Sequence, residues 1–335
     1  MHKKVKKCIA LMLAALMIVG FVPFVDIAPT TASAASVWGG SYSNDGGFYG
    51  SGPYYISTAN GLAYFAQTVK NGTTYSGKTV YLTVDCDMAN KSFTGLSGYG
   101  EAFKGTFDGQ NNTISNININ IRDNRVGLFR ITQNATIKNL VLSTVSVTGN
   151  ATGTGGLIGY AIDSVTVSNV RVYGAKITGN TNTGGLVGDS HKAVFSNCSF
   201  EGTVTSVGND IGGILGKSNT DGTSFTNCTV GTSSSKATIK TTDARGGGII
   251  GNYASDYTCA FTNSVVYANV NISGGPGGGF LGNTAGHTTA NNCLFNGTVT
   301  ASNNAGGIIG WVSDDEQILS SCTTLGTITS KGSGA

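Results

Sequence analysis

Apolar residues recur in short clusters at a nearly constant interval along most of the chain. Each cluster reads Gly-Gly, two apolar residues and Gly, and polar segments rich in Thr, Ser and Asn separate the clusters. The six copies occupy residues 155–159, 184–188, 212–216, 247–251, 278–282 and 306–310. Their first residues lie 29, 28, 35, 31 and 28 positions apart. A degenerate copy at residues 126–129 precedes them, so the pattern predicts seven repeats of one structural unit.

Two further segments recur with the same period. One is a triplet centred on Asn or Ser, at residues 138–140, 168–170, 196–198, 226–228, 262–264, 291–293 and 320–322. The other is an alternating strand pattern, at residues 145–148, 175–178, 202–205, 297–300 and 326–329. About three short strands per period, with no amphipathic helix, predict one coil of a parallel β-helix solenoid and exclude helical repeats and leucine-rich horseshoes. The expected fold class is therefore all-β.

Equivalent residues of successive coils in a parallel β-helix stack in columns. The last residue of each triplet is expected to point inward, because Leu and Val share its column with Cys. That column comprises Leu140, Val170, Cys198, Cys228, Ser264, Cys293 and Cys322. Period-two alternation also directs inward Val147, Ile177, Val204, Val299 and Ile328. The Asn at each bend is expected to adopt left-handed backbone angles and to hydrogen-bond its copies, while Gly allows close approach of the coils.

The Gly-Gly-apolar-apolar-Gly copies resemble the GLUG motif, which is found in bacterial exported adhesin-like proteins and near the N-termini of immunoglobulin-A-cleaving metallopeptidases. Residues 53–59, 105–109 and 126–129 are similar to the entry region that these proteins share. The resemblance spans residues 55–328. It implies a parallel β-helix on a bacterial surface, and it implies no reaction.

Residues 1–34 have the pattern of a secretory signal peptide. Lysines precede an apolar run at residues 8–25, and a small-residue cleavage site ends at Ala34. A membrane anchor is the alternative, but Gly20 and Pro23 interrupt the apolar run. We expect cleavage near Ala34, no membrane span after cleavage, and a secreted or cell-surface protein.

Removal of the leader changes the charge of the chain. The whole sequence has 20 basic and 17 acidic residues, a formal net charge of +3, and only 11% charged side chains. Residues 1–34 hold four of the lysines and one aspartate, which leaves 16 basic and 16 acidic groups. A neutral mature chain has no field that would attract nucleic acid or anionic lipid, so neither is an expected partner.

The remaining chain is expected to form two parts: a cap with the first coils at residues 35–110, and the repeats at residues 111–335. Ser57 is the expected N-cap of a helix that buries Leu62 and Phe65 and ends at Asn71. After residue 329 only a short polar segment follows in the sequence. The last coil is therefore expected to expose a β edge and to associate end to end with another chain.

Six cysteines remain after the leader, and four of them occupy one column. The favoured interpretation is a stack of buried, unpaired thiols that act as small apolar side chains. The alternative is a disulfide between Cys198 and Cys228, or between Cys293 and Cys322, which lie on neighbouring coils. No Cys-x-x-Cys pair occurs, so no metal site is expected.

Candidate catalytic residues are scarce. The mature chain has two histidines and no His-Glu-x-x-His motif, so zinc peptidase chemistry is not expected. Asp314 and Asp315 beside Trp311 form the one cluster that resembles a glycosidase or lyase site, but a solvated acidic turn explains it as well. No catalytic residue, cofactor site or metal site is therefore assigned.

Threonines on alternating strands form a second candidate contact surface. They should face outward and could order water or dock a sugar, although Lys176, Lys240 and Asn269 interrupt the array. The members considered are Thr203, Thr205, Thr298, Thr300, Thr327 and Thr329, of which the first four are the candidate contacts. The expected function is an exported bacterial adhesin or binding scaffold without catalysis, with a host, matrix or glycan ligand. The alternative is a carbohydrate-active β-helix enzyme with its site in the turn loops.

Overall fold

The structure, a computed structural model, describes residues 34–96, 100, 102–220, 222–243, 245–313 and 316–332. The helix of this part is α2 (Ala59–Lys70). The N-terminal strands are β1 (Ser36–Val37), β2 (Phe48–Gly50), β3 (Tyr54–Ile56), β4 (Thr79–Leu82), β5 (Cys86–Asp87), β6 (Thr106–Asp108), β7 (Thr113–Ile121), β8 (Phe129–Gln133) and β9 (Thr136–Gly149). The predicted leader, except Ala34, lies outside the described residues.

The strands of the repeats follow in order. They are β10 (Thr152–Gly155), β11 (Ile158–Gly179), β12 (Thr181–Gly184), β13 (Val187–Ser196), β14 (Ser199–Ser206), β15 (Ile211–Gly212), β16 (Leu215–Ser218), β17 (Ser224–Thr226), β18 (Thr229–Val230), β19 (Ala237–Thr241), β20 (Gly246–Gly247), β21 (Ile250–Tyr253), β22 (Cys259–Thr262), β23 (Val265–Val266), β24 (Ala268–Ile272), β25 (Gly277–Gly278), β26 (Leu281–Thr284), β27 (Thr288–Asn291), β28 (Leu294–Phe295), β29 (Thr298–Ala301), β30 (Ala305–Gly306), β31 (Ile309–Val312), β32 (Gln317–Ser320), β33 (Thr323–Thr324) and β34 (Thr327–Ser330).

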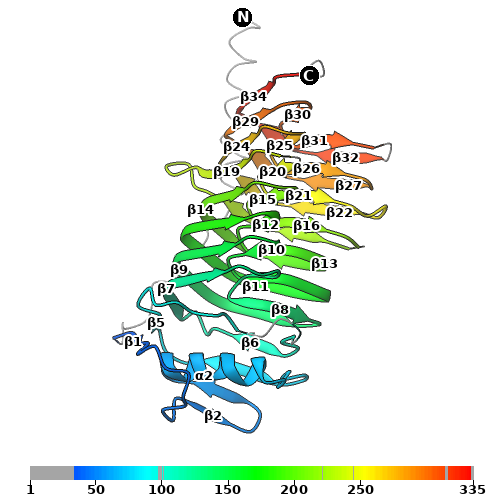
Figure 1. The fold of residues 1–335 in the computed structure, drawn as a ribbon. Helices are drawn as coiled ribbons and strands as arrows, with labels where there is room; N and C mark the ends of the chain where they lie inside the picture. The colour runs from blue at the N-terminus through cyan, green and yellow to red at the C-terminus, as the bar shows by residue number, and fades with distance from the viewer. Residues whose placement is uncertain are drawn as a thin grey trace, which may run out of the picture. The chain divides into compact units, whose positions relative to one another are not determined.

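The strands wind into a parallel β-helix of about nine turns, which confirms the expected fold class. Each strand of a repeat pairs in parallel with its equivalent one coil further on, as β21 does with β26 and β26 with β31. Figure 1 shows these coils stacked one above another. The three segments expected per coil are each present, but bends divide them further, so that one coil contains β20, β21, β22, β23 and β24.

The short distance between successive coils requires glycine in the pentapeptide. A Cβ atom on Gly213 would lie 2.2 Å from the carbonyl oxygen of Gly248, and one on Gly248 would lie 2.0 Å from that of Gly279. None of these three glycines has a positive φ. The close approach of successive coils therefore selects glycine here, because any side chain would collide with the backbone of the next coil.

The predicted inward column is confirmed. Leu140, Val170, Cys198, Cys228, Ser264 and Cys293 are all buried, and Cys322 in the last coil is half-buried. A second inward column stacks aromatic rings. The ring centres of Phe195 and Phe225 lie 4.9 Å apart, and those of Phe225 and Phe261 lie 5.2 Å apart. The two rings of each pair are nearly parallel. The identical register of successive coils brings like side chains together, as the repeat predicts.

The asparagines at the bend form a hydrogen-bonded ladder. Asn139, Asn169, Asn197, Asn227, Asn263 and Asn292 all have φ values between 50° and 53°. In four pairs of neighbouring coils the Nδ2 of one asparagine donates to the Oδ1 of the previous one over 2.9–3.0 Å. The ladder begins at Asp108, whose Oδ1 accepts from Asn139 Nδ2 at 3.0 Å. A carboxylate suits this position because the first rung needs only an acceptor.

The N-terminal helix covers the core as expected, but the prediction of Ser57 as its N-cap is wrong by one residue. Thr58, rather than Ser57, adopts the extended N-cap conformation, and its Oγ1 accepts from the Gly61 N–H at 2.9 Å. The two residues carry similar hydroxyls, so their sequence pattern does not distinguish them. The ring of Phe65, on the buried face of α2, packs against that of Phe103 with 5.9 Å between the ring centres. This contact joins the helix to the first coils. The helix ends at Asn71, as predicted.

The last coil exposes residues that earlier coils bury. Leu319 occupies the same column as Phe261 and Ala290, yet 49% of it is accessible, whereas Ala290 is 1% accessible. Ile318 and Leu325 on this coil are also exposed.

Within the described residues, no helix is both long and apolar enough to span a bilayer.

Candidate functional site

The residue that follows each pentapeptide forms an outward column, here called the outer column. It runs in register across β11, β13, β16, β21, β26 and β31. Its members are Tyr160, Asp189, Lys217, Asn252, Asn283 and Trp311. The pentapeptide fixes the backbone of every rung, while the side chain at this position changes from coil to coil. Variable chemistry on a constant frame is the arrangement expected of a recognition surface.

A second column stands beside it and is here called the corner column. Two residues before each pentapeptide lie Gly153, Asn182, Asp210, Arg245, Pro276 and Asn304, and Arg125 takes the equivalent place before the degenerate copy. Arg125, Asn182 and Asp210 have left-handed φ values of 61°, 55° and 59°. This conformation turns their side chains toward the outer column, and several of them bond to it.

Three corner residues fill the space between the columns. The Arg125 guanidinium lies 4.8 Å from the centre of the Tyr160 ring. Asn182 Nδ2 donates to Asp189 Oδ2 at 2.8 Å. Asp210 Oδ2 accepts from Asn252 Nδ2 at 3.2 Å, and its Oδ1 accepts from the Nε of Arg245 at 2.7 Å.

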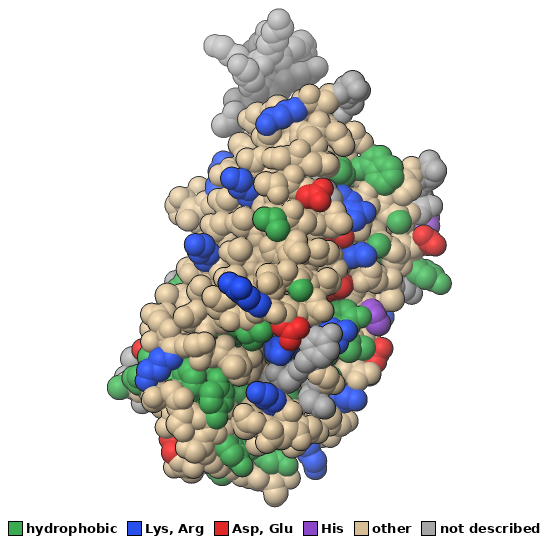
Figure 2. All heavy atoms as spheres, in the orientation of Figure 1, with side chains coloured by type: hydrophobic (Ala, Val, Ile, Leu, Met, Phe, Trp, Pro, Cys, Tyr) green, Lys and Arg blue, Asp and Glu red, His purple; other side chains and the backbone are tan. Residues whose placement is uncertain are grey.

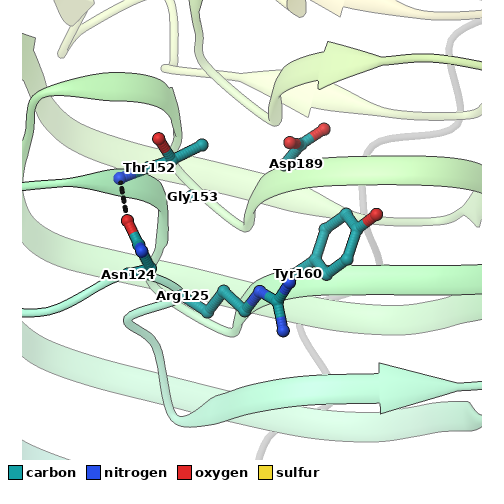
Figure 3. A pocket seen from close by; sticks show the side chains of 6 residues that line it. All are labelled: Asn124, Arg125, Thr152, Gly153, Tyr160 and Asp189. Carbon is teal, nitrogen blue, oxygen red and sulfur yellow. Dashed lines mark hydrogen bonds between the residues drawn. The ribbon is translucent and has the colours of Figure 1, made fainter. Parts of the chain in front are cut away.

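Gly153 interrupts this filling and leaves a pocket of about 210 Å³. Its φ of 80° keeps the left-handed corner, but it has no side chain to reach the outer column. The pocket is lined by Asn124, Arg125, Thr152, Gly153, Tyr160 and Asp189. Figure 3 shows Arg125 beside the Tyr160 ring, with Asp189 on the next strand and Asn124 and Thr152 on the opposite side. Asn124 Oδ1 accepts from the Thr152 N–H at 2.9 Å.

Asp189 is the acidic group of the pocket. Its Oδ1 accepts from Asn219 Nδ2 and its Oδ2 from Asn182 Nδ2, both at 2.8 Å. Burial raises the pKa of Asp189 above its ordinary value, against the opposing effects of these amides and of Lys217. The carboxylate is therefore held in a fixed orientation while its remaining lone pairs can accept further hydrogen bonds.

Tyr160 and Arg125 form the opposite wall. The Tyr160 hydroxyl is hydrogen-bonded to His191 Nε2 at 2.8 Å, and burial, reinforced by the charge of Asp189, raises the pKa of Tyr160. Arg130 Nε donates to the carbonyl oxygen of Arg125 at 3.1 Å, and Arg130 is itself paired with Asp123 at 2.7 Å. These contacts hold the backbone beneath the pocket in one conformation.

The lining limits the chemistry that the pocket can perform. Glycoside hydrolysis usually needs two carboxyl groups on either side of the bond, and the lining supplies only Asp189. No group of three or more metal-ligating side chains occurs in the described part of the chain. What the pocket does offer is a set of fixed hydrogen-bond donors and acceptors, which suits binding.

The residues singled out from the sequence lie elsewhere. Trp311 is 44% accessible at the end of the outer column, while Asp314 and Asp315 fall outside the described residues. The threonines lie on two strands, Thr203 and Thr205 on β14, and Thr298 and Thr300 on β29. Their columns are interrupted as expected, since Lys176 and Lys240 pair with the first two threonines and Asn269 with Thr298. None of the four threonines lines the pocket.

Sequence reasoning missed Arg125, Tyr160 and Asp189. A signal was present, because the residues flanking the invariant pentapeptide differ in each repeat. Figure 2 shows Lys, Arg, Asp and Glu side chains interspersed on the visible face.

The six described cysteines are free thiols. Cys293 and Cys322 are neighbours in the last two coils, and the Cys293 thiol donates a hydrogen bond that lowers the pKa of Cys322 to about 6. The same contact, together with burial, raises the pKa of Cys293. Cys322 is also the most accessible of the six.

We expect iodoacetamide to alkylate Cys322 selectively in the native protein, because the thiolate is the reacting species and the other thiols are buried. The rate should rise around pH 6, where Cys322 ionises, and approach its plateau by neutral pH. Peptide mass spectrometry would locate the label, and the Cys322→Ser variant should remain unmodified. Labelling of Cys228 before unfolding, or a midpoint near the ordinary thiol pKa of about 8.5, would contradict the assignment.

Comparison with known proteins gives limited matches. No protein family profile matches the chain. It is 32% identical over 149 residues to halomucin of Haloquadratum walsbyi, a match that covers 41% of this chain and 2% of halomucin. The crystal structure of a Bacteroides ovatus protein proposed to be an immunoglobulin A1 protease is similar, with a TM-score of 0.59 and 18% identity over 82% of this chain and 86% of that one. At this identity the likeness concerns the fold alone.

Proposed function

We propose that the chain is an exported surface adhesin or binding scaffold that holds a glycan in the pocket over Gly153 and catalyses no reaction on it. The observation that carries this proposal is the missing side chain at Gly153, within a corner that its neighbours fill. The predicted leader at residues 1–34 supports export. The rigid solenoid supports a scaffold role, because it presents the pocket at a fixed distance from its capped end.

The lining favours a glycan over a charged peptide side chain. A cationic group would meet Arg125, and an anionic group would meet Asp189, since both line the pocket. A neutral sugar satisfies both walls, because each hydroxyl can donate to a carboxylate and accept from a guanidinium or amide.

Filling the pocket tests the proposal. Gly153→Asn should raise the Kd for a glycan at least tenfold. A Cβ at position 153 would lie 2.9 Å from the carbonyl oxygen of Gly159, so the melting temperature should fall, and binding is measured at a temperature where circular dichroism shows the variant folded. Asn is chosen because Asn182 occupies the next corner position with a left-handed φ of 55°, and Asn tolerates this region better than most residues. Binding would be measured on an array of neutral glycans and then by calorimetry.

Gly174→Asn is the matched control, since Gly174 has a left-handed φ of 59° and lies outside the pocket lining. It should bind as the unmodified chain does. Unchanged binding by Gly153→Asn would refute the pocket as the glycan site, and the absence of binding to every glycan tested would refute the function.

One observation favours the alternative of a carbohydrate-active enzyme. Tyr160 is hydrogen-bonded to His191 beside a carboxyl group whose raised pKa would help it to hold a proton. An enzyme would release reducing ends or unsaturated sugars from a polysaccharide, whereas an adhesin would bind it without consuming it. Turnover that disappears in the Asp189→Asn variant would establish the alternative.

A second copy of the chain is the proposed partner at the last coil. Leu319 is half exposed although its column is buried in earlier coils, so association would cover apolar surface. We expect a purified chain of residues 35–335 to form dimers or larger species by light scattering. Leu319→Glu should favour the monomer, whereas Val207→Glu, on an exposed residue away from this coil, should not. A monomer at high concentration would contradict this expectation.

A further inference from the structure

We infer that the pocket takes the terminal ring of a neutral glycan end-on, and does not bind a segment within a chain. This inference rests on the proposed glycan-binding function. It follows from two walls that close the pocket along the solenoid axis. The lower wall lies toward the helical cap, and the upper wall lies toward the C-terminal coils.

The lower wall is the Arg125–Tyr160 stack. Arg125 belongs to the coil before Gly153, and its guanidinium lies 4.8 Å from the centre of the Tyr160 ring in the next coil. The backbone of Arg125 is held by Arg130, which pairs with the Asp123 carboxylate. A polymer running along the axis would have to displace this stack.

The upper wall consists of two successive groups of side-chain hydrogen bonds. Asn182 bridges the corner column to Asp189, and one coil further Asp210 bonds both Arg245 and Asn252. Asn283 then donates to Asn252 Oδ1 at 2.8 Å, and both asparagines are buried. The space between the two columns is therefore filled above Asp189, and a ligand chain cannot continue along it.

The distance between the lower and upper walls leaves room for one sugar ring. Arg125 and Asn182 are two coils apart, and successive coils are separated by about 4.8 Å, so their backbones lie roughly 10 Å apart. Both side chains occupy part of that distance, and the remaining pocket has a volume of about 210 Å³. A ring that enters from solvent must therefore carry the rest of its chain outward.

The chemistry of the lining sets the class of ring. Asp189 accepts from hydroxyl donors on one side, and the Arg125 guanidinium and the Asn124 amide present N–H donors on the other. A uronate would be repelled by Asp189, and an ammonium sugar by Arg125. The geometry thus points to a neutral terminal monosaccharide whose adjacent hydroxyls meet the two walls.

The test compares oligomers of one to four rings, built on neutral hexoses, fucose or N-acetylglucosamine, by calorimetry on the mature chain. We expect Kd values that agree within about threefold across a series sharing one terminal ring. Extending that ring with a further sugar of a different kind should weaken binding at least tenfold. Affinity that grows with each added ring, or retained binding to the extended glycan, would overturn end-on recognition.

Two variants separate this inference from the proposed function. If Gly153→Asn abolishes binding but affinity grows with chain length, the pocket is correct and end-on recognition is wrong. If Gly153→Asn binds normally, the pocket assignment fails and both ideas fall. Asp189→Asn provides a second measurement, because it preserves the size of the side chain. It should lower affinity at least tenfold for the single ring and for the tetramer alike.

Discussion

Replacement of Cys228 by aspartate is expected to destabilise the protein by on the order of 4 kcal/mol, because a carboxylate in this column has no charged partner. Cys228 is fully buried between Cys198 and Ser264, and Cys228 and Ser264 lie close enough for the Cys228 N–H to donate to Ser264 Oγ at 3.1 Å. Thermal and denaturant unfolding would measure the effect.

The pH dependence of this variant gives an independent check. Burial should raise the pKa of the introduced carboxyl in the folded state above its unfolded value of about 3.9, so the folded state prefers the protonated form. The deficit in unfolding free energy relative to the unmodified protein should therefore be smallest below pH 4 and should grow as the pH rises.

The matched control is Cys228→Ser. Ser264 already occupies this column, where its hydroxyl lies 3.3 and 3.1 Å from the carbonyl oxygens of Phe225 and Thr262 and can donate its proton to either. A serine at position 228 should find similar acceptors and cost only about 1 kcal/mol. If the aspartate variant unfolded at the same temperature as the unmodified chain, the inward direction of this column would be wrong.

Gly248→Ala should have the second large effect, a loss of about 3 kcal/mol or more. The added Cβ would lie 2.0 Å from the carbonyl oxygen of Gly279 and 2.6 Å from Cγ1 of Val266. The first of these atoms belongs to the backbone of the next coil, so the contact is relieved only if the two coils separate. Differential scanning calorimetry would report the change.

Gly100→Ala is the control for this prediction, because a Cβ on Gly100 would meet no atom of the described residues within 4 Å. Its melting temperature should stay within the range of a neutral surface change. Equal stability of Gly248→Ala and the unmodified protein would show that the pentapeptide glycines are not required by the spacing of the coils.

The fold could be predicted because stacked coils convert sequence periodicity directly into contacts. Cys198, Cys228 and Cys293 each end the triplet that follows a pentapeptide, and the structure places them in one buried column. The asparagines at the bend could be predicted for the same reason. The position of each asparagine in the repeat predicts which asparagines are adjacent to it in the fold. No other pairing between distant parts of the sequence has to be known.

The pocket could not be predicted in this way, because it depends on a departure from the repeat. Gly153 is one of many glycines, and its missing side chain has meaning only once Arg125 and Asn182 are known to fill the same corner. The contacts around it join different parts of a coil or different coils, as Asn252 and Asp210 do across 42 residues. No local pattern encodes such a pair.

The asparagine ladder makes the length of the solenoid adjustable. Asn169, Asn197 and Asn227 each donate to the asparagine of the preceding coil, and Asn292 donates to Asn263, so most coils present the same pair of faces to their neighbours. Gain or loss of one whole coil therefore leaves Asp108 at the start of the ladder and the helical cap beneath it unchanged. The reach of a pocket from the capped end can then change in steps of one coil, by duplication or deletion of a single repeat.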